Sequence, residues 1–91
     1  MLPIRWNAKA VDELNAIAGY IARFNPIAAE GLQDLIEASV LALSEHPYLY
    51  RIGRVGGTRE FVVHPNYIVI YRVRTDHVEI LGVLHAAREY P

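Results

Sequence analysis

The chain has 91 residues, 53% of them hydrophobic and 21% charged, which is enough for one compact domain and leaves no room for a second core. It contains no cysteine, so disulfides, thiolate metal sites and cysteine nucleophiles are excluded. The formal net charge of −1 argues against an affinity that comes mainly from nucleic-acid phosphates, and the lack of a long apolar run or a signal-peptide layout predicts a cytoplasmic protein without a membrane partner.

The first half of the chain is predicted to form a short strand and two helices. Apolar residues alternate along residues 2–6, which is the period of a half-buried strand. An amphipathic helix is expected from residue 8 to about residue 24, with Asn7 as its N-cap. Asn25-Pro26 then ends this helix and begins a second one that runs to about residue 45, so the two form a tight hairpin.

The second half changes to a strand pattern with turn glycines. Strands are expected at residues 58–64, 67–74 and 78–84, after a loop and an edge strand around residues 51–55. The connections between the three strands are so short that they require an antiparallel meander. We therefore predict a single α+β domain over residues 1–91, in which an N-terminal strand and the helical hairpin precede the meander and the helices pack on one face of the sheet.

The predicted sheet and the second helix are more apolar than one packing face requires. Val69, Tyr71 and Val73 lie on one face of their strand, and Ile68 and Ile70 lie on the other. The apolar arc of the second helix spans roughly 200° at 100° per residue. Packing of the second helix between the first helix and the sheet would account for about half of this surplus, and the remainder indicates a site for a protein partner.

The charges are divided unequally along the chain. Residues 1–49 carry a formal charge of −3, whereas residues 50–91 carry +2 and hold six of the nine basic residues, all arginines. This division suggests two different surfaces, although ordinary solvated charge explains the same numbers equally well.

The end of the chain holds the one group of side chains that could carry acid–base chemistry. His85, Arg88 and Tyr90 place an imidazole, a guanidinium and a phenol within six positions, which suits attack on a phosphodiester. A tail that caps the sheet or binds a partner would use the same residues, and that reading is favoured. The four histidines form no spacing typical of a metal site, so neither a metal nor a cofactor is expected.

Several segments, in their order and spacing, resemble the RelE/ParE superfamily of bacterial toxins. The resemblance covers nearly the whole chain and implies a small sheet with an N-terminal helical hairpin. The matching segments are Tyr20-Ile-Ala-Arg-Phe-Asn-Pro-Ile-Ala-Ala, Pro47 with Gly53-Arg54, Gly57-Thr-Arg-Glu-Phe-Val-Val63, Tyr67-Ile-Val-Ile-Tyr-Arg-Val73 and Val83-Leu-His-Ala-Ala-Arg88.

The resemblance is closer to the ParE branch than to the branch that cuts messenger RNA. The RNA-cleaving members usually carry an arginine after the aromatic that opens the central strand and a Lys/Arg pair after the last strand, where this chain has Ile68 and His85-Ala86. A cleavage site without these cations lacks the main source of charge stabilisation. The ParE branch implies a non-enzymatic toxin that poisons DNA gyrase. The alternatives are a ribosome-dependent endoribonuclease that uses His85, Arg88 and Tyr90, or a toxin fold that has lost toxicity.

The ParE branch also implies two partners and two binding surfaces. A cognate ParD-like antitoxin would form a hetero-oligomer with the toxin, gyrase would be the target, and the toxin alone would not read nucleic-acid sequence. Antitoxin contacts are expected at Tyr20, Phe24, Leu35, Val40 and Leu41. Target contacts are expected at Arg51, Arg54, Arg59, Glu60, His85 and Arg88. Of these, Arg59 shares a strand face with Phe61 and Val63 and could equally be paired inside the fold.

Overall fold

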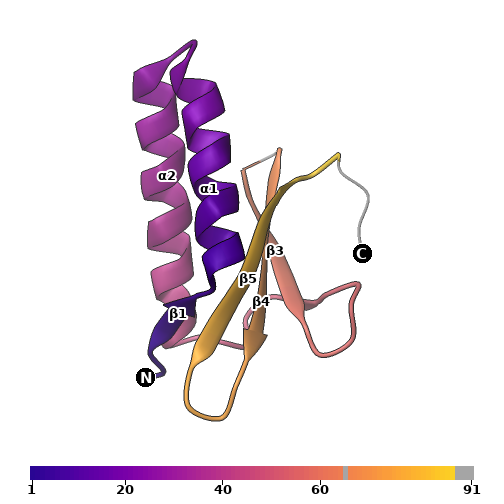
Figure 1. Ribbon diagram of the computed structural model, residues 1–91. Helices are drawn as coiled ribbons and strands as arrows, with labels where there is room; N and C mark the ends of the chain where they lie inside the picture. Colours follow the sequence, from indigo (N-terminus) through magenta and orange to yellow (C-terminus); the bar gives the residue numbers. More distant parts are fainter. Residues whose placement is uncertain (65, 88–91) are drawn as a thin grey trace.

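A computed structural model describes residues 1–64 and 66–87 of the chain. A short strand and a helical hairpin are followed by a short 3₁₀ turn and four more strands (Figure 1). In chain order the elements are β1 (Ile4–Trp6), α1 (Ala8–Ala22), α2 (Pro26–Leu41), the 3₁₀ turn η1 (Ala42–Ser44), β2 (Arg51–Ile52), β3 (Arg59–His64), β4 (Tyr67–Val73) and β5 (Val78–His85). The predicted order of elements is confirmed.

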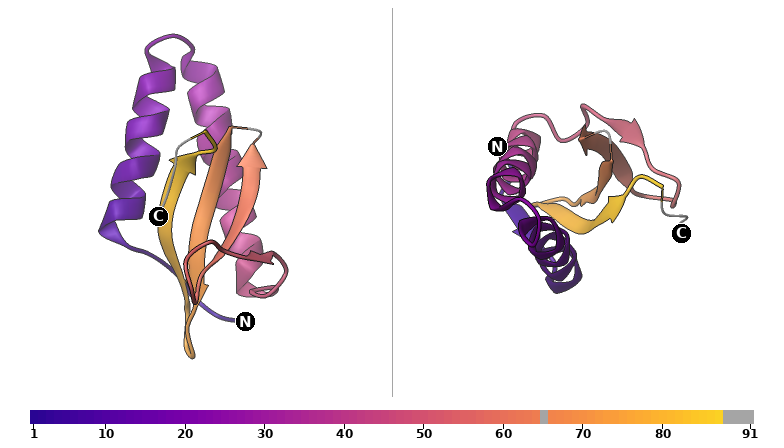
Figure 2. Two further views of the ribbon diagram at one scale, coloured as in Figure 1. Left: turned by 90° about the vertical axis from the view of Figure 1, so that its right-hand side faces the viewer. Right: turned by 90° about the horizontal axis from the view of Figure 1, so that it is seen from above.

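The five strands form one sheet in the order β1-β5-β4-β3-β2. Strands β2 to β5 pair antiparallel in sequence order, as predicted for a meander. Strand β1 pairs parallel with β5, with Ile4 opposite Val78 and Trp6 opposite Ile80. Both helices lie on the same side of the sheet (Figure 2), so the α+β class and the one-sided helical layer are confirmed.

The predicted N-caps of both helices are confirmed. The Asn7 side-chain oxygen accepts from the Ala10 N–H at 2.8 Å, and the Asn25 oxygen accepts from the Ala28 N–H at 3.0 Å. The predicted ends of the helices are wrong by a few residues. Helix α1 ends at Ala22, because Asn25 precedes a proline, takes an extended conformation and leaves the two residues before it to reverse the chain. Helix α2 tightens into η1 after Leu41 instead of continuing as an α-helix to residue 45.

The main core lies between the helices and the sheet. Its largest fully buried apolar side chains are Tyr71, Ile36, Leu43, Ile80, Val40, Val69, Val78 and Val83. Two of them, Ile80 and Val83, are three residues apart on β5, although strict alternation would put them on opposite faces. A β-bulge between them reverses the alternation, because Ile70 pairs with Gly82 whereas Tyr71 pairs with Ile80. The bulge therefore lets β5 bury both side chains against the helices.

The carboxylate of Glu13 on α1 contacts the backbone at this bulge. The Val83 N–H donates to Glu13 Oε1 at 3.2 Å. The same oxygen lies 3.0 Å from the position that a Cβ atom would occupy on Gly82, so only glycine lets the carboxylate approach without adjustment. Glu13 thus joins the helical layer to the irregular part of β5.

Replacing Glu13 by alanine is expected to lower the free energy of unfolding by about 1–2 kcal/mol, because the part-buried Val83 N–H loses a charged acceptor. Glu13→Gln keeps a side-chain oxygen and should retain most of this stability. The matched control is Asp12→Ala, a change of the exposed acidic neighbour that should stay within about 0.5 kcal/mol. Denaturant unfolding measures all three, and an equal effect of the Glu13 and Asp12 changes would contradict the role of the contact.

Candidate functional site

The face of the sheet turned away from the helices, here called the open sheet face, has an apolar centre. Ile68, Ile70 and Leu84 are buried there, with 3%, 8% and 7% of their surfaces exposed. Leu81 and Ala86 pack against them. The prediction that the sheet is apolar on both faces is confirmed.

A cluster of one glutamate and two arginines borders this apolar centre. Glu60 Oε1 accepts from Arg51 Nη2 at 2.9 Å and lies 3.5 Å from Arg54 Nε, while Glu60 Oε2 lies 3.4 Å from the Arg54 backbone nitrogen. Only 2% of the Glu60 side chain is exposed, against 60% for Arg51 and 44% for Arg54. The buried carboxylate therefore positions the two guanidinium groups, and both arginine side chains remain partly exposed.

Arg59 points away from this cluster, toward the helix side of the sheet. Its Nη1 donates to the Tyr50 carbonyl at 2.8 Å, and its guanidinium lies 5.0 Å from the centre of the Tyr48 ring. The nearby Tyr71 hydroxyl donates to the Pro47 carbonyl at 3.0 Å. Burial raises the pKa of the Tyr71 phenol, and the positive charge of Arg59 opposes that rise. Arg59 is thus paired inside the fold, where it fixes the segment before β2.

Arg59→Gln is expected to lower the free energy of unfolding by about 1–3 kcal/mol, since it removes a charged donor from the Tyr50 carbonyl. The control is Arg5→Gln on β1, which makes the same change at an exposed strand arginine and should stay within about 0.5 kcal/mol. Thermal unfolding of both variants tests this. If Arg59→Gln were as stable as the parent chain, Arg59 would have to be returned to the set of candidate target contacts.

His85 lies at the end of β5, on the face opposite to the Glu60 cluster. Its ring contacts the Tyr67 ring with centres 5.4 Å apart, and Tyr67 packs against the main core. The Ala87 N–H donates to His85 Nδ1 at 3.1 Å, so the neutral ring in this arrangement carries its proton on Nε2. The structure therefore does not bring His85 together with Arg51 and Arg54. The predicted contact Arg88, like Tyr90 of the nuclease alternative, lies outside the described residues.

All five residues predicted to meet an antitoxin lie on the helical hairpin, and four of them are exposed. Tyr20 and Phe24 are 61% and 73% exposed at its tip, with ring centres 5.5 Å apart. Leu35 and Leu41 are 44% and 66% exposed along α2. Val40 differs because it is 1% exposed and belongs to the core. It packs beneath the exposed residues of α2 and presents almost no surface of its own for contact.

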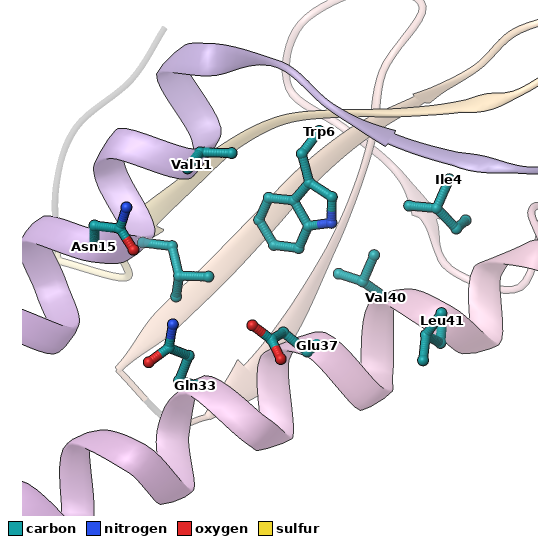
Figure 3. A pocket seen from close by; sticks show the side chains of 9 residues that line it. Ile4, Trp6, Val11, Asn15, Gln33, Glu37, Val40 and Leu41 are labelled. Carbon is teal, nitrogen blue, oxygen red and sulfur yellow. The ribbon is translucent and has the colours of Figure 1, made fainter.

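An apolar groove of about 500 Å³ opens between the two helices above β1 (Figure 3). The Trp6 indole lies between α1 and α2 in this view. The apolar lining residues are Ile4, Trp6, Val11, Leu14, Val40 and Leu41, and the polar ones are Asn15, Gln33 and Glu37. Sequence reasoning missed Trp6 and Val11 as surface-lining residues, because their periodicity marks them only as facing the core.

The described residues 1–64 and 66–87 contain no group of three or more His, Asp or Glu side chains that could hold a metal ion. In the same part of the chain, no helix is both long and apolar enough to cross a membrane. The features that remain are an apolar groove on one side and an arginine-bearing face on the other. Exposed apolar grooves and charged faces of this kind are typical of surfaces that contact other macromolecules.

Comparison with known proteins identifies the family. The model of the ParE toxin of the type II toxin–antitoxin system parDE matches residues 4–90. The chain therefore belongs to this family, and it is the toxin of a type II toxin–antitoxin module.

Two relatives agree with this assignment, and two solved structures share the fold. The chain is 42% identical to the putative toxin Y4kP of Sinorhizobium fredii, over 97% of this chain and 92% of that protein. It is 34% identical to Toxin RelE2 of Caulobacter vibrioides, over 97% and 99%. A structure of the chromosomal ParDE system of P. aeruginosa has the same fold, with a TM-score of 0.83 at 22% identity over 93% of this chain and 96% of that one. The YoeB dimer of Staphylococcus aureus shares the fold more distantly, with a TM-score of 0.64 at 14% identity over 98% of both chains.

Proposed function

We propose that this toxin poisons DNA gyrase and that a cognate ParD-like antitoxin holds it inactive in a hetero-oligomer. In this proposal the toxin binds gyrase and stalls its cleaved-DNA state without itself hydrolysing a bond. The match to the ParE family model over residues 4–90 supports this branch.

The observation that carries the proposal is the apolar centre of the open sheet face. Ile68, which stands where RNA-cleaving relatives usually have an arginine, is 3% exposed and packs with Ile70 and Leu84. Cleavage of a phosphodiester develops negative charge that must be stabilised, and this is often the largest catalytic effect. An aliphatic cluster at this place supplies no such stabilisation.

The arrangement of His85 also favours a binding role over acid–base catalysis. Its Nδ1 accepts from the Ala87 N–H, which leaves only Nε2 to exchange a proton with a substrate. In the neutral ring Nε2 already carries the proton and cannot act as a base. The nuclease alternative keeps His85, Arg88 and Tyr90 as its candidate catalytic groups.

The proposed target contacts are the exposed arginines Arg51 and Arg54, together with Arg88. Glu60 acts through them, because its buried carboxylate sets the positions of the first two. Guanidinium groups held in this way are suited to bidentate contacts with carboxylates or phosphates.

Purified toxin added to gyrase is expected to inhibit supercoiling or to accumulate cleaved DNA, whereas translating ribosomes should acquire no new messenger cuts. Arg51→Gln should weaken inhibition about tenfold, the effect of losing roughly 1.4 kcal/mol of binding. Arg23→Gln, which removes an exposed arginine near the tip of the hairpin, is the matched control and should leave inhibition unchanged. Cleavage of messenger RNA in the ribosome that disappears in His85→Ala would reverse the assignment of the target.

The antitoxin is proposed to bind the helical hairpin, with apolar side chains in the groove beside Trp6 and others over Tyr20 and Phe24. The groove is lined mainly by apolar residues, and Leu41 remains 66% exposed at its border. Apolar surface of this kind is suited to a helix or an extended segment of a partner.

Leu41→Glu is expected to weaken binding of the antitoxin at least tenfold, because complex formation would bury an unpaired carboxylate beside Glu37. Leu49→Glu is the matched control, since Leu49 has the same side chain and a similar exposure of 62% but does not line the groove. Calorimetric titration of both variants with the antitoxin measures the difference. Equal affinities would show that the partner does not use this groove.

A further inference from the structure

A second group of arginines lies on the open sheet face beside the Glu60 cluster. In the register of the sheet, Arg5 on β1 and Arg72 on β4 both stand opposite Glu79 of β5. These three residues therefore form one row across three strands. Arg74, just after β4, brings its Nε to 3.2 Å from Glu79 Oε1. We call Arg5, Arg72 and Arg74 the arginine row.

The strand periodicity places the arginine row on the open sheet face. Ile4 and Trp6 pack against the main core, so Arg5 between them points to the other side. Arg72 is two residues from Ile70, which belongs to the apolar cluster of the open sheet face. Arg74 reaches the same side through its contact with Glu79.

One guanidinium of the arginine row has a donor that the described part of the fold does not use. Arg72 Nε is buried and has no hydrogen-bond partner among residues 1–64 and 66–87. Buried donors in folded proteins nearly always have an acceptor. Because this atom is enclosed, a negatively charged group that arrives at this face would reach it only after an outward movement of the Arg72 side chain.

The two sides of the molecule carry opposite formal charge. The open sheet face and the turn beside it bear five arginines against three acids, a formal charge of +2. These residues are Arg5, Arg51, Arg54, Arg72 and Arg74, with Glu60, Asp76 and Glu79. The hairpin segment 8–44 holds five acids against Lys9 and Arg23, a formal charge of −3. The overall charge of −1 therefore conceals a cationic face that is suited to a polyanion.

The aromatic side chains of the strands distinguish between kinds of polyanion. Trp6, Phe61, Tyr67 and Tyr71 all pack into the core on the helix side. None of these four Trp, Phe and Tyr rings of the described strands therefore lies on the open sheet face, where an unpaired base could stack on it. Single-stranded DNA and RNA loops are bound largely through such stacking, whereas a duplex is held through its phosphates.

We propose that the open sheet face binds the phosphate backbone of duplex DNA without reading its sequence, through the arginine row. The choice of DNA rests on the proposed function, since gyrase holds a DNA duplex while the toxin acts on it. The inference adds a second contact to that function: Arg51 and Arg54 meet the enzyme, and the arginine row meets the DNA beside it.

The test is fluorescence anisotropy of the purified full-length chain with a labelled duplex of about 20 base pairs and with a single strand and an RNA hairpin of matched length. We expect the duplex to bind most tightly. Neutralisation of about three phosphates predicts a log–log salt slope near −3, so affinity should fall roughly 40-fold between about 50 and about 200 mM salt. The double variant Arg5→Gln/Arg74→Gln should reduce the slope by about two and weaken binding at least tenfold at low salt.

The matched control replaces Arg23 and Lys9 by glutamine, which removes the same charge from the helix side and should leave duplex binding unchanged. Equal losses in the two double variants, tighter binding of the RNA hairpin, or no binding at low salt would each overturn the proposal. Circular dichroism verifies that both variants are folded, and Arg72→Lys serves as a second variant of the row.

A parallel supercoiling assay separates this inference from the proposed function. If the toxin inhibits gyrase but does not bind the duplex, the DNA contact is wrong and gyrase poisoning stands. If it binds the duplex through the arginine row but leaves gyrase active, the DNA contact stands and gyrase poisoning is wrong.

Discussion

The alternation of side chains across the sheet determines which strand residues of this toxin enter the core and which form the open sheet face. Successive residues of a strand point to opposite faces, so the aromatic rings of Trp6, Phe61 and Tyr71 go to the helix side and their arginine or glutamate neighbours go to the other. The bulge beside Gly82 reverses this alternation at one point in β5. Glu13 of α1 accepts a hydrogen bond from the Val83 N–H at this point. A slip of one residue in any central strand would exchange core and binding surface along its whole length.

A buried carboxylate is the second organising element. Glu60 is 2% exposed, yet it lies on the face that has no helical cover. A carboxylate enclosed without partners would cost several kcal/mol, so the fold keeps two guanidinium groups around it. The consequence is that two exposed arginines have defined positions, which flexible side chains on an open surface ordinarily do not have. The cluster therefore fixes the geometry of the proposed target surface, because each exposed guanidinium is held against an enclosed carboxylate.

Local sequence signals were sufficient to predict the elements, but the sites depend on contacts between distant residues. Asn7 and Asn25 marked the helix starts correctly because a cap is a contact over three residues. The groove was not predictable, because it exists only where Trp6 of β1 lies between two helices. The sequence also predicts Glu60 as a target contact. Its side chain is buried instead, because the pairing of β2 with β3 places Arg51 opposite it. The arginine row is intermediate: the two-residue period places Arg5 and Arg72 opposite the core, but only the sheet order brings them beside Glu79.

Strand β1 connects the two surfaces. Ile4 and Trp6 line the groove proposed for the antitoxin, whereas Arg5 between them belongs to the arginine row proposed for DNA. This strand lies at the edge of the sheet, so a chain that leaves the groove need only pass one strand to reach the open sheet face. Under the proposed function, an antitoxin segment long enough to continue past β1 would cover Arg5 and compete with DNA there. A segment confined to the groove would leave all the arginines of the open sheet face accessible. Neutralisation by direct competition therefore requires an antitoxin that extends beyond the helical hairpin.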